Sequence, residues 1–232
     1  MAGRSDRRGN AGKGALREPS APDLPADFAP GTLPDHDLED GGVYEQLAFD
    51  EVDLSGREAA GAEIEACRFA NVKLSQVKLR RALIRDVAFD RCDLANLRAL
   101  ESSFTRVAIS ACRMTGASML DVNLRDVTFN GCRIDLSSFR ASKLDDVVFE
   151  GCRMDQADFA DADLRGARFE GCALTAAQFS GARMSGTRFS GCELTGISGV
   201  TSMRGAIITS TDAVALADIL ASALGIKIED RL

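Results

Sequence analysis

The sequence predicts an all-β solenoid, a quadrilateral β-helix that ends in a C-terminal capping α-helix. Three observations predict it: large apolar residues recur at every fifth position, cysteine and phenylalanine recur at every twentieth, and glycine recurs at one place in the twenty-residue unit. A period of five fits neither the helical repeat of about 3.6 residues nor the alternation of an ordinary strand. A chain that turns at a corner after every five residues fits it, and four such sides close one coil.

The five-residue lattice runs from Phe49 to Leu194 and has 30 positions. Only Ala59 and Ala99 are not Phe, Leu, Ile or Met, and eleven of the twelve phenylalanines lie on the lattice. Two positions earlier in each pentapeptide, small or β-branched residues predominate, and all seven cysteines occur there. One large and one small side chain per pentapeptide are therefore expected to point inward. The segment 97–101 departs from the pattern, and we expect a kink or bulge there.

Columns with a spacing of twenty residues give the coils their register. One column contains Cys92, Cys112, Cys132, Cys152, Cys172 and Cys192, a second contains Phe49, Phe69, Phe89, Phe129, Phe149, Phe169 and Phe189, and a third contains Gly131, Gly151, Gly171 and Gly191. Glycine at a recurring corner indicates a turn with φ > 0. Thirty pentapeptides make about 7.5 coils, or a rod of roughly 36 Å at an inter-strand spacing of ~4.8 Å.

Several segments resemble the repeat unit of the pentapeptide-repeat family, in which Ala, then Asp or Asn, precedes Leu. The segments are 157–159 (Ala-Asp-Phe), 162–166 (Ala-Asp-Leu-Arg-Gly) and 92–94 (Cys-Asp-Leu). The resemblance covers about residues 45–208 and implies the right-handed quadrilateral β-helix of that family. The chain departs from the family pattern where arginine replaces Asp or Asn before the large residue, at Arg68, Arg113, Arg133 and Arg153.

The chain divides into three parts. Residues 1–42 contain all five prolines and are rich in Arg, Gly, Ser and Asp, which predicts a disordered leader. Residues 43–208 form the β-helix. Residues 209–232 contain the capping helix and a short tail, with an N-cap at 210–212, a stop at Gly225 and a short strand at 226–228. The chain shows neither a secretory signal nor a membrane-spanning run, so a cytoplasmic location without membrane contact is expected.

The capping helix has more apolar surface than one buried face requires. Its candidate cap and dimer residues are Leu216, Ile219, Leu220 and Leu224. Covering the open end of the β-helix accounts for part of this surface, since an open end exposes unpaired backbone groups. The remainder predicts a homodimer through the C-terminal end. The resemblance implies the same, because some members of the family dimerise there.

The chemistry-bearing residues predict no catalytic site, no cofactor and no metal. His36 is the only histidine and lies in the leader, far from any nucleophile that it could activate. Pairs such as Asp145 and Asp146 lie on a convex rod without a cleft. The cysteine column permits two interpretations, a metal or redox ladder and a row of small apolar residues. The second is favoured, because zinc requires four converging ligands and burial makes thiols inert. The chain is not expected to be an enzyme.

Charge is the remaining functional signal. The formal net charge is −7, and residues 44–200 contain 20 basic and 23 acidic groups, which argues against direct nucleic-acid binding. Residues 121–163 contain 10 acidic and 5 basic groups. The candidate interaction surface contains Asp50, Asp90, Asp145, Asp146, Glu150 and Glu170.

Two functions compete for this surface. The preferred one is a non-enzymatic scaffold that presents its rigid sides to a protein partner of unknown identity. The alternative is a DNA mimic that binds a type II topoisomerase such as gyrase and modulates quinolone sensitivity, as the resemblance implies, because some relatives bind gyrase in this way. Arginine columns at 113, 133 and 153 and at 85, 125 and 165 interrupt any uniform acidic face. This interruption favours the scaffold.

Overall fold

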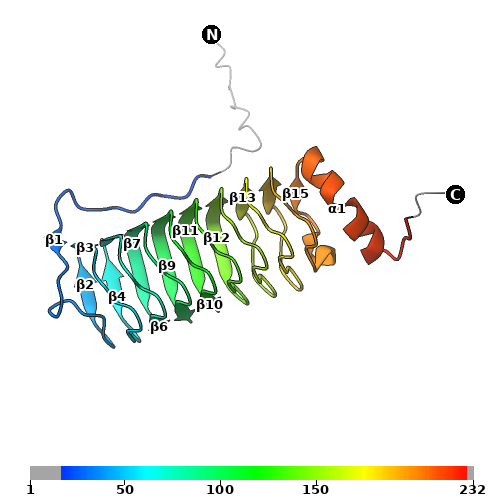
Figure 1. Ribbon diagram of the computed structural model, residues 1–232. Coiled ribbons are helices and arrows are strands. Elements are labelled where there is room, and N and C mark those ends of the chain that lie inside the picture. The colour runs from blue at the N-terminus through cyan, green and yellow to red at the C-terminus, as the bar shows by residue number, and fades with distance from the viewer. Residues whose placement is uncertain (1–16, 229–232) are drawn as a thin grey trace, which may run out of the picture.

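A computed structural model describes residues 17–228 and shows a parallel β-solenoid followed by a helix (Figure 1). This confirms the predicted fold, a right-handed quadrilateral β-helix with a C-terminal helix. The strands are β1 (Ala29–Pro30), β2 (Val43–Glu45), β3 (Leu47–Asp50), β4 (Glu63–Glu65), β5 (Arg68–Ala70), β6 (Lys78–Arg80), β7 (Leu83–Asp90), β8 (Arg98–Leu100), β9 (Ser103–Ser110), β10 (Ser118–Leu120), β11 (Asn123–Asn130), β12 (Lys143–Glu150), β13 (Arg168–Glu170), β14 (Arg188–Ser190) and β15 (Ile207–Ile208). The helices are the 3-10 helix η1 (Val200–Met203) and α1 (Ser210–Ala223).

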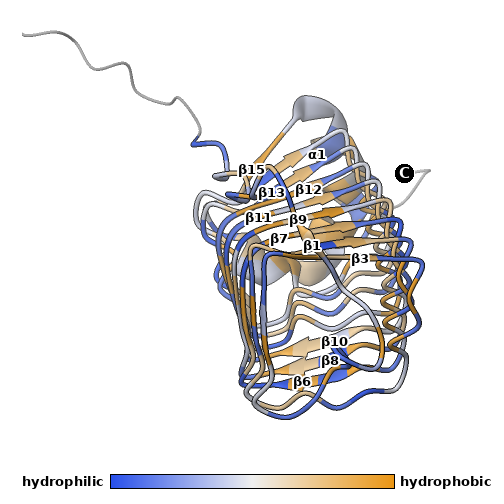
Figure 2. Cartoon of the chain, turned by 90° about the vertical axis from the view of Figure 1, so that its left-hand side faces the viewer, coloured by the Kyte–Doolittle hydropathy of each residue, from blue (hydrophilic) through white to orange (hydrophobic). Residues whose placement is uncertain are grey.

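From β2 to β14, successive coils pair in parallel at an offset of twenty residues, whereas the end strands β1 and β15 pair at offsets of 18 and 19. Phe129 lies opposite Phe149, and Phe89 lies opposite Ile109. One 12-stranded sheet covers two adjacent sides, because strands such as β7 and β9 continue around the corner between them. A three-stranded sheet of β6, β8 and β10 lies on the side opposite the second of these, as the view along the axis shows (Figure 2). The pairing confirms the columns expected from the sequence.

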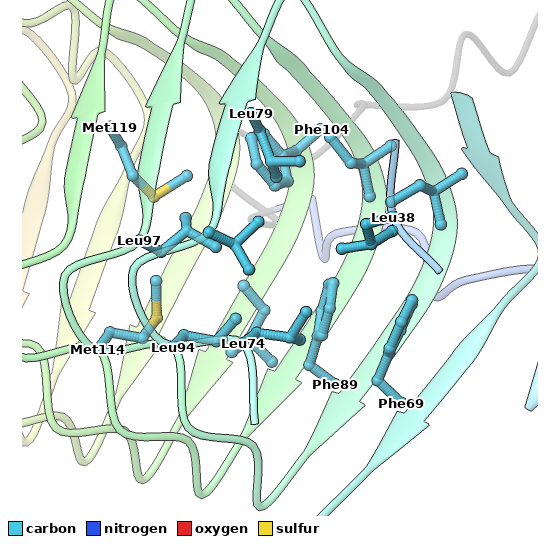
Figure 3. A pocket seen from close by; sticks show the side chains of 14 residues that line it. Leu38, Phe69, Leu74, Leu79, Phe89, Leu94, Leu97, Phe104, Met114 and Met119 are labelled. Atoms are coloured by element: carbon cyan, nitrogen blue, oxygen red, sulfur yellow. The ribbon is translucent and has the colours of Figure 1, made fainter. Parts of the chain in front are cut away.

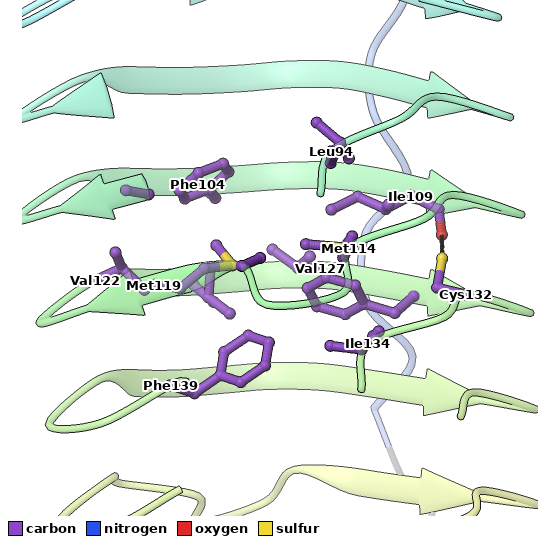
Figure 4. Packing of buried hydrophobic residues seen from close by; sticks show 14 of the residues in the cluster. Leu94, Phe104, Ile109, Met114, Met119, Val122, Val127, Cys132, Ile134 and Phe139 are labelled. Atoms are coloured by element: carbon purple, nitrogen blue, oxygen red, sulfur yellow. Dashed lines mark hydrogen bonds between the residues drawn. The ribbon is translucent and has the colours of Figure 1, made fainter. Parts of the chain in front are cut away.

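Stacked side chains fill the interior. Phe149 is fully buried and stacks on Phe129 with a centroid distance of 4.6 Å and an interplanar angle of 10°. Phe139, from a different side of the coil, meets Phe149 edge to face at 5.8 Å. Offset stacking and edge-to-face contact are both favourable arrangements of aromatic rings. Figure 4 shows how large side chains from all sides meet along the axis.

The segment 97–101 keeps its register, contrary to the kink or bulge expected from the sequence. Strand β8 pairs with β6 and β10 at the same twenty-residue offset, so that Ala99 lies between Leu79 and Met119. An apolar cavity of about 30 Å³ lies in the N-terminal half of the core and is lined by side chains that include Leu97 and Phe104 (Figure 3). A cavity of this size without polar groups has no room for a ligand and stays dry.

Every corner of the coil has a residue with positive φ, at intervals of five along the chain. The expected glycine column obeys this rule, with φ of 58° at Gly131 and 57° at Gly151. Among residues 17–228, twenty residues other than glycine also adopt positive φ, including Leu136 and Ala141. A left-handed conformation costs such a residue roughly 1–2 kcal/mol. The inter-coil hydrogen bonds and the packed core hold these corners in place.

We expect Gly151→Ala to lower the free energy of unfolding by about 1 kcal/mol and Leu136→Gly to raise it. A Cβ at Gly151 would have no heavy atom within 4 Å, so the change isolates the backbone conformation. Leu136 is 58% exposed, so its removal costs little packing. Urea unfolding of the two variants measures both effects. If both substitutions raised the free energy of unfolding, or both lowered it, the assignment of backbone strain to the corners would be contradicted.

Residues 17–42 differ from the predicted disordered leader, and residues 1–16 lie outside the described part of the chain. Residues 29–42 close the first coil: β1 pairs with β3, Leu38 is buried, and the Tyr44 hydroxyl donates to the Asp37 carbonyl at 2.7 Å. Residues 17–28, called the strap below, run back along the solenoid from the coil of β12 to β1 (Figure 1). Specific polar contacts with distant coils position this segment, which could not be inferred from its low hydrophobicity.

Candidate interaction surfaces

The predicted acidic column lies at the ends of the strands that carry the phenylalanines. Pairing between coils places its members in the order Asp50, Ala70, Asp90, Ser110, Asn130, Glu150, Glu170 and Ser190. Four of the eight positions are therefore uncharged. The column is real, but its negative charge is discontinuous.

Local partners reduce the charge of this column further. Asp90 lies 2.8 Å from the Arg91 guanidinium, and Glu170 lies 3.2 Å from Arg168. The Glu150 carboxylate accepts a hydrogen bond from the Asn130 amide at 2.9 Å. Such exposed pairs add little stability. Their effect is to alternate the sign of the charge along this edge.

Asp145 and Asp146 lie elsewhere on the coil, at the corner crossed by β12. Asp145 is 3.3 Å from the Arg125 guanidinium on the preceding coil. Asp146 is paired with Arg17 of the strap. The structure thus separates the predicted surface into two parts, the acidic column and this corner. Asp145 and Asp146 lie on the same coil as Glu150 but at the corner inside β12, whereas Glu150 lies at the end of that strand.

The corner that contains Asp146 also holds Asp86, Arg106 and Asp126, and we call these four residues the corner column. Asp86 and Asp126 are 5% and 6% exposed. Burial opposes the ionisation of Asp86, but hydrogen bonds from Arg106 and from the Asp23 N–H outweigh it and lower the pKa of the carboxyl. Sequence reasoning missed the importance of this column, because its residues are forty or more positions from the strap that they contact.

The six cysteines of the column, together with Cys67, are buried and free. Each thiol donates to a backbone carbonyl, for example from Cys132 to Ile109 at 3.3 Å (Figure 4). Burial raises the pKa of Cys67, and hydrogen bonding to the neighbouring thiols together with burial raises the pKa of Cys112. Within residues 17–228, no group of three or more His, Cys, Asp or Glu side chains could hold a metal ion.

We expect all seven thiols to be protected from a thiol reagent in the native protein and to react in urea, because the reagent needs an accessible thiolate. Native and unfolded samples titrated in parallel with an aromatic disulfide reagent measure this. Rapid reaction of any thiol without unfolding, or stoichiometric zinc in the purified protein, would contradict the assignment of these residues to the core.

The C-terminal end separates the four predicted cap and dimer residues into two pairs. Leu216 is 1% exposed and Ile219 is partly buried against the core, so this pair caps the last coil. Leu220 is 39% and Leu224 76% exposed. A groove of about 300 Å³ between η1 and α1 is lined by residues that include Met203, Ile208 and Leu220. The outward pair and this groove form the apolar end surface.

The helix α1 begins one residue earlier than expected and is fixed by a carboxylate. The Thr209 side chain accepts from the Asp212 N–H at 3.2 Å and is the N-cap. Asp212 is 3% exposed and accepts from the N–H groups of Gly191 and Cys192, both at 3.1 Å. In earlier coils the corresponding N–H groups donate to the following coil. At the last coil, the Asp212 carboxylate accepts from them instead. Gly225 has φ of 73° just past the helix, as expected, whereas residues 226–228 are not a strand.

No helix in the described part of the chain is long and apolar enough to cross a membrane. None of the curated proteins compared with the chain matches it.

Solved structures of several proteins are similar to the chain, among them those of QnrB1, HetL and Rfr23. QnrB1, a plasmid-mediated fluoroquinolone resistance protein, is 21% identical, with 82% of this chain and 91% of that chain covered and a TM-score of 0.37. HetL, involved in heterocyst differentiation regulation in the cyanobacterium Nostoc sp. strain PCC 7120, is 18% identical, with coverage of 72% and 87% and a TM-score of 0.31. Rfr23 from the cyanobacterium Cyanothece 51142 is 12% identical, with coverage of 73% and 89% and a TM-score of 0.20.

The family model of the pentapeptide repeat region matches residues 62–139, 102–179 and 122–198. These overlapping matches together span more than half of the chain. The chain belongs to the pentapeptide-repeat family.

Proposed function

We propose that the chain is a non-enzymatic cytoplasmic scaffold that presents the sides of its solenoid to a protein partner. The proposal is based on one contrast: the interior of the solenoid is filled, whereas its exterior presents ordered columns of side chains. Packed side chains fill the interior, whose apolar cavity of about 30 Å³ offers no place for chemistry. Outside, side chains stand in columns held in register by inter-coil hydrogen bonds. A surface ordered before binding loses little entropy when a partner docks. Seven free cysteines agree with a reducing compartment.

The purified full chain, used as bait, tests the proposal together with a surface variant. The variant replaces Asp50, Asp90, Glu150 and Glu170 by their amides, which keeps their size and removes their charge. We expect a partner that binds the wild-type chain with a defined stoichiometry and is weakened by the variant. A chain that captures no stoichiometric partner in its native extract, or that turns over a substrate, would contradict the scaffold.

DNA mimicry of a type II topoisomerase substrate is the second candidate. The 10 acidic residues between 121 and 163 favour it. The ion pairs Arg125–Asp145 and Arg140–Asp158 and the uncharged positions of the acidic column disfavour it, because a duplex presents phosphates without interruption. We therefore expect purified chain at micromolar concentration to leave gyrase supercoiling unchanged, with and without a quinolone. Inhibition or protection that disappears in the amide variant would favour mimicry over the general scaffold.

We also propose a homodimer through the apolar end surface. Leu220 lines the groove between η1 and α1, and Leu224 and Ile226, at and after the end of α1, are 76% and 56% exposed. Burying such side chains against a second copy would stabilise the dimer by about 1.5–3 kcal/mol for each leucine that becomes fully buried. Light scattering of the full chain and of Leu220→Asp/Leu224→Asp measures this. A wild-type monomer at high micromolar concentration would contradict it.

A further inference from the structure

The strap is an extended segment with a three-residue repeat. Prolines recur at Pro19, Pro22 and Pro25, and Phe28 continues the series. All four are half-buried, as is Leu24 beside Pro25, whereas Ser20, Ala21 and Asp23 are exposed. A repeat of three is that of a polyproline II helix, which rises about 3.1 Å per residue and has no internal hydrogen bonds. The strap therefore turns one edge toward the solenoid along its length.

The corner column matches this repeat. The Ser20 N–H donates to Asp126 at 2.9 Å, and the Asp23 N–H donates to Asp86 at 2.9 Å. The donors are three residues apart, or about 9.3 Å along a polyproline II helix. The acceptors are two coils apart, or about 9.6 Å. Two coils of the solenoid thus correspond to one turn of the strap.

Charged contacts hold the N-terminal end of the strap. Arg17 lies 3.0 Å from Asp126 and also pairs with Asp146. Arg168 donates to the Arg17 carbonyl at 3.2 Å and pairs with Glu18. Arg168 points outward from its strand, yet its side chain is only 5% exposed. The strap thus contacts charges of both signs across the coils that it crosses.

Small uncharged side chains are interspersed with arginines on the surface beside these contacts. The column that faces outward on this side consists of Ala48, Arg68, Ala88, Ala108, Thr128, Val148, Arg168 and Arg188. Val148 is 8% exposed although it points away from the core, and Glu18 lies at the same hollow. At the far end, the Arg68 guanidinium lies 5.3 Å from the centre of the Phe28 ring. Glu18, Val148 and Arg168 line a hollow of about 410 Å³. We call this hollow, together with the corner column that the strap contacts, the groove.

We infer that this groove is a binding site for proline-rich peptides in the polyproline II conformation, and that the strap occupies it in cis. The trans ligand is an extended segment with prolines at intervals of three and an arginine at its N-terminal end. Main-chain N–H groups that meet Asp86 and Asp126 set its position along the groove, and the arginine that meets Asp126 and Asp146 sets its direction. A partner gains access by displacing the strap.

The test uses the full chain and a fluorescent peptide copied from residues 16–29. The cis strap competes at a high effective concentration, so wild-type chain should bind the peptide weakly. In Arg17→Glu the strap is repelled by Asp126 and Asp146 while the groove is unchanged, and we expect peptide affinity to rise by about tenfold or more. Fluorescence anisotropy measures both affinities, and circular dichroism checks that the variant folds.

Three controls locate the binding. Adding Asp126→Asn/Asp146→Asn to Arg17→Glu should reduce the affinity by about tenfold, because the peptide arginine loses both carboxylates. Adding Asp50→Asn, in the acidic column, should leave it unchanged. A peptide with its three prolines replaced by alanine should bind more weakly, because it must pay the ordering entropy that proline removes.

Failure of the folded Arg17→Glu chain to bind the peptide would overturn the inference, as would equal binding by wild type and variant. A wild-type dimer that Arg17→Glu converts to a monomer would place the strap on a second copy and overturn the cis arrangement. The inference rests on the proposed scaffold function, but different experiments test the peptide site and the scaffold. The titration reports on this groove alone, whereas the bait experiment detects partners on any side.

Discussion

Replacing Phe149 by Ala is expected to lower the free energy of unfolding by about 4 kcal/mol. Phe149 is fully buried, stacks on Phe129 at 4.6 Å and on Phe169 at 5.0 Å, and meets Phe139 and Phe159 edge to face. Its removal leaves a cavity that the neighbouring coils cannot close, because inter-coil hydrogen bonds fix their spacing. The loss is larger than that of a typical substitution, since it interrupts a continuous aromatic column.

Phe28→Ala is the matched control, because Phe28 is the one phenylalanine outside the lattice and is only half-buried. Its contact with Arg68 should contribute about 1 kcal/mol. Urea unfolding of both variants, followed by circular dichroism, gives the comparison. A loss below about 1 kcal/mol for Phe149→Ala would show that the column tolerates a void and that its stacking is not cooperative.

Replacing Asp212 by Ala is expected to release helix α1 and open the C-terminal end of the solenoid. The carboxylate accepts from the N–H groups of Gly191 and Cys192 and from the Thr209 hydroxyl at 2.7 Å. Leaving the buried Cys192 N–H without a partner costs about 1–3 kcal/mol. The last coil should therefore exchange its amide hydrogens much faster, while coils near Phe129 stay protected, because each repeat contacts only its neighbours.

Hydrogen exchange measured by mass spectrometry distinguishes these regions. Asp218→Ala is the control, since Asp218 is an exposed carboxylate on the same helix. Asp212→Asn should have an intermediate effect, because its amide keeps one acceptor oxygen and loses the other. Unchanged protection of residues 188–192 in Asp212→Ala would contradict the capping role. Loss of the dimer in the same variant would connect this cap with the apolar end surface.

The charged residues show how far the candidate surfaces could be predicted. The sequence locates the acidic column correctly, since the twenty-residue spacing assigns Asp50, Asp90, Glu150 and Glu170 to one line. It could not reveal that Arg91 and Arg168 pair with two of them. Those pairs depend on side-chain directions at corners and across coils. The candidate cap and dimer residues separate into a buried pair and an exposed pair for a similar reason. The orientation of α1 on the last coil decides which face of the helix is buried.

The periodic residues by themselves determined the four-sided coil, its register and its dry core. A pentapeptide with one large and one small inward residue leaves the chain few alternatives, because each slip of the register would expose apolar side chains. Only the tertiary structure decided where the strap lies and how the C-terminal end is closed. Ser20 meets Asp126, and Asp212 meets Cys192, only after the coils have stacked. Contacts between unrepeated residues leave no periodic pattern, so their positions follow from the three-dimensional fold alone.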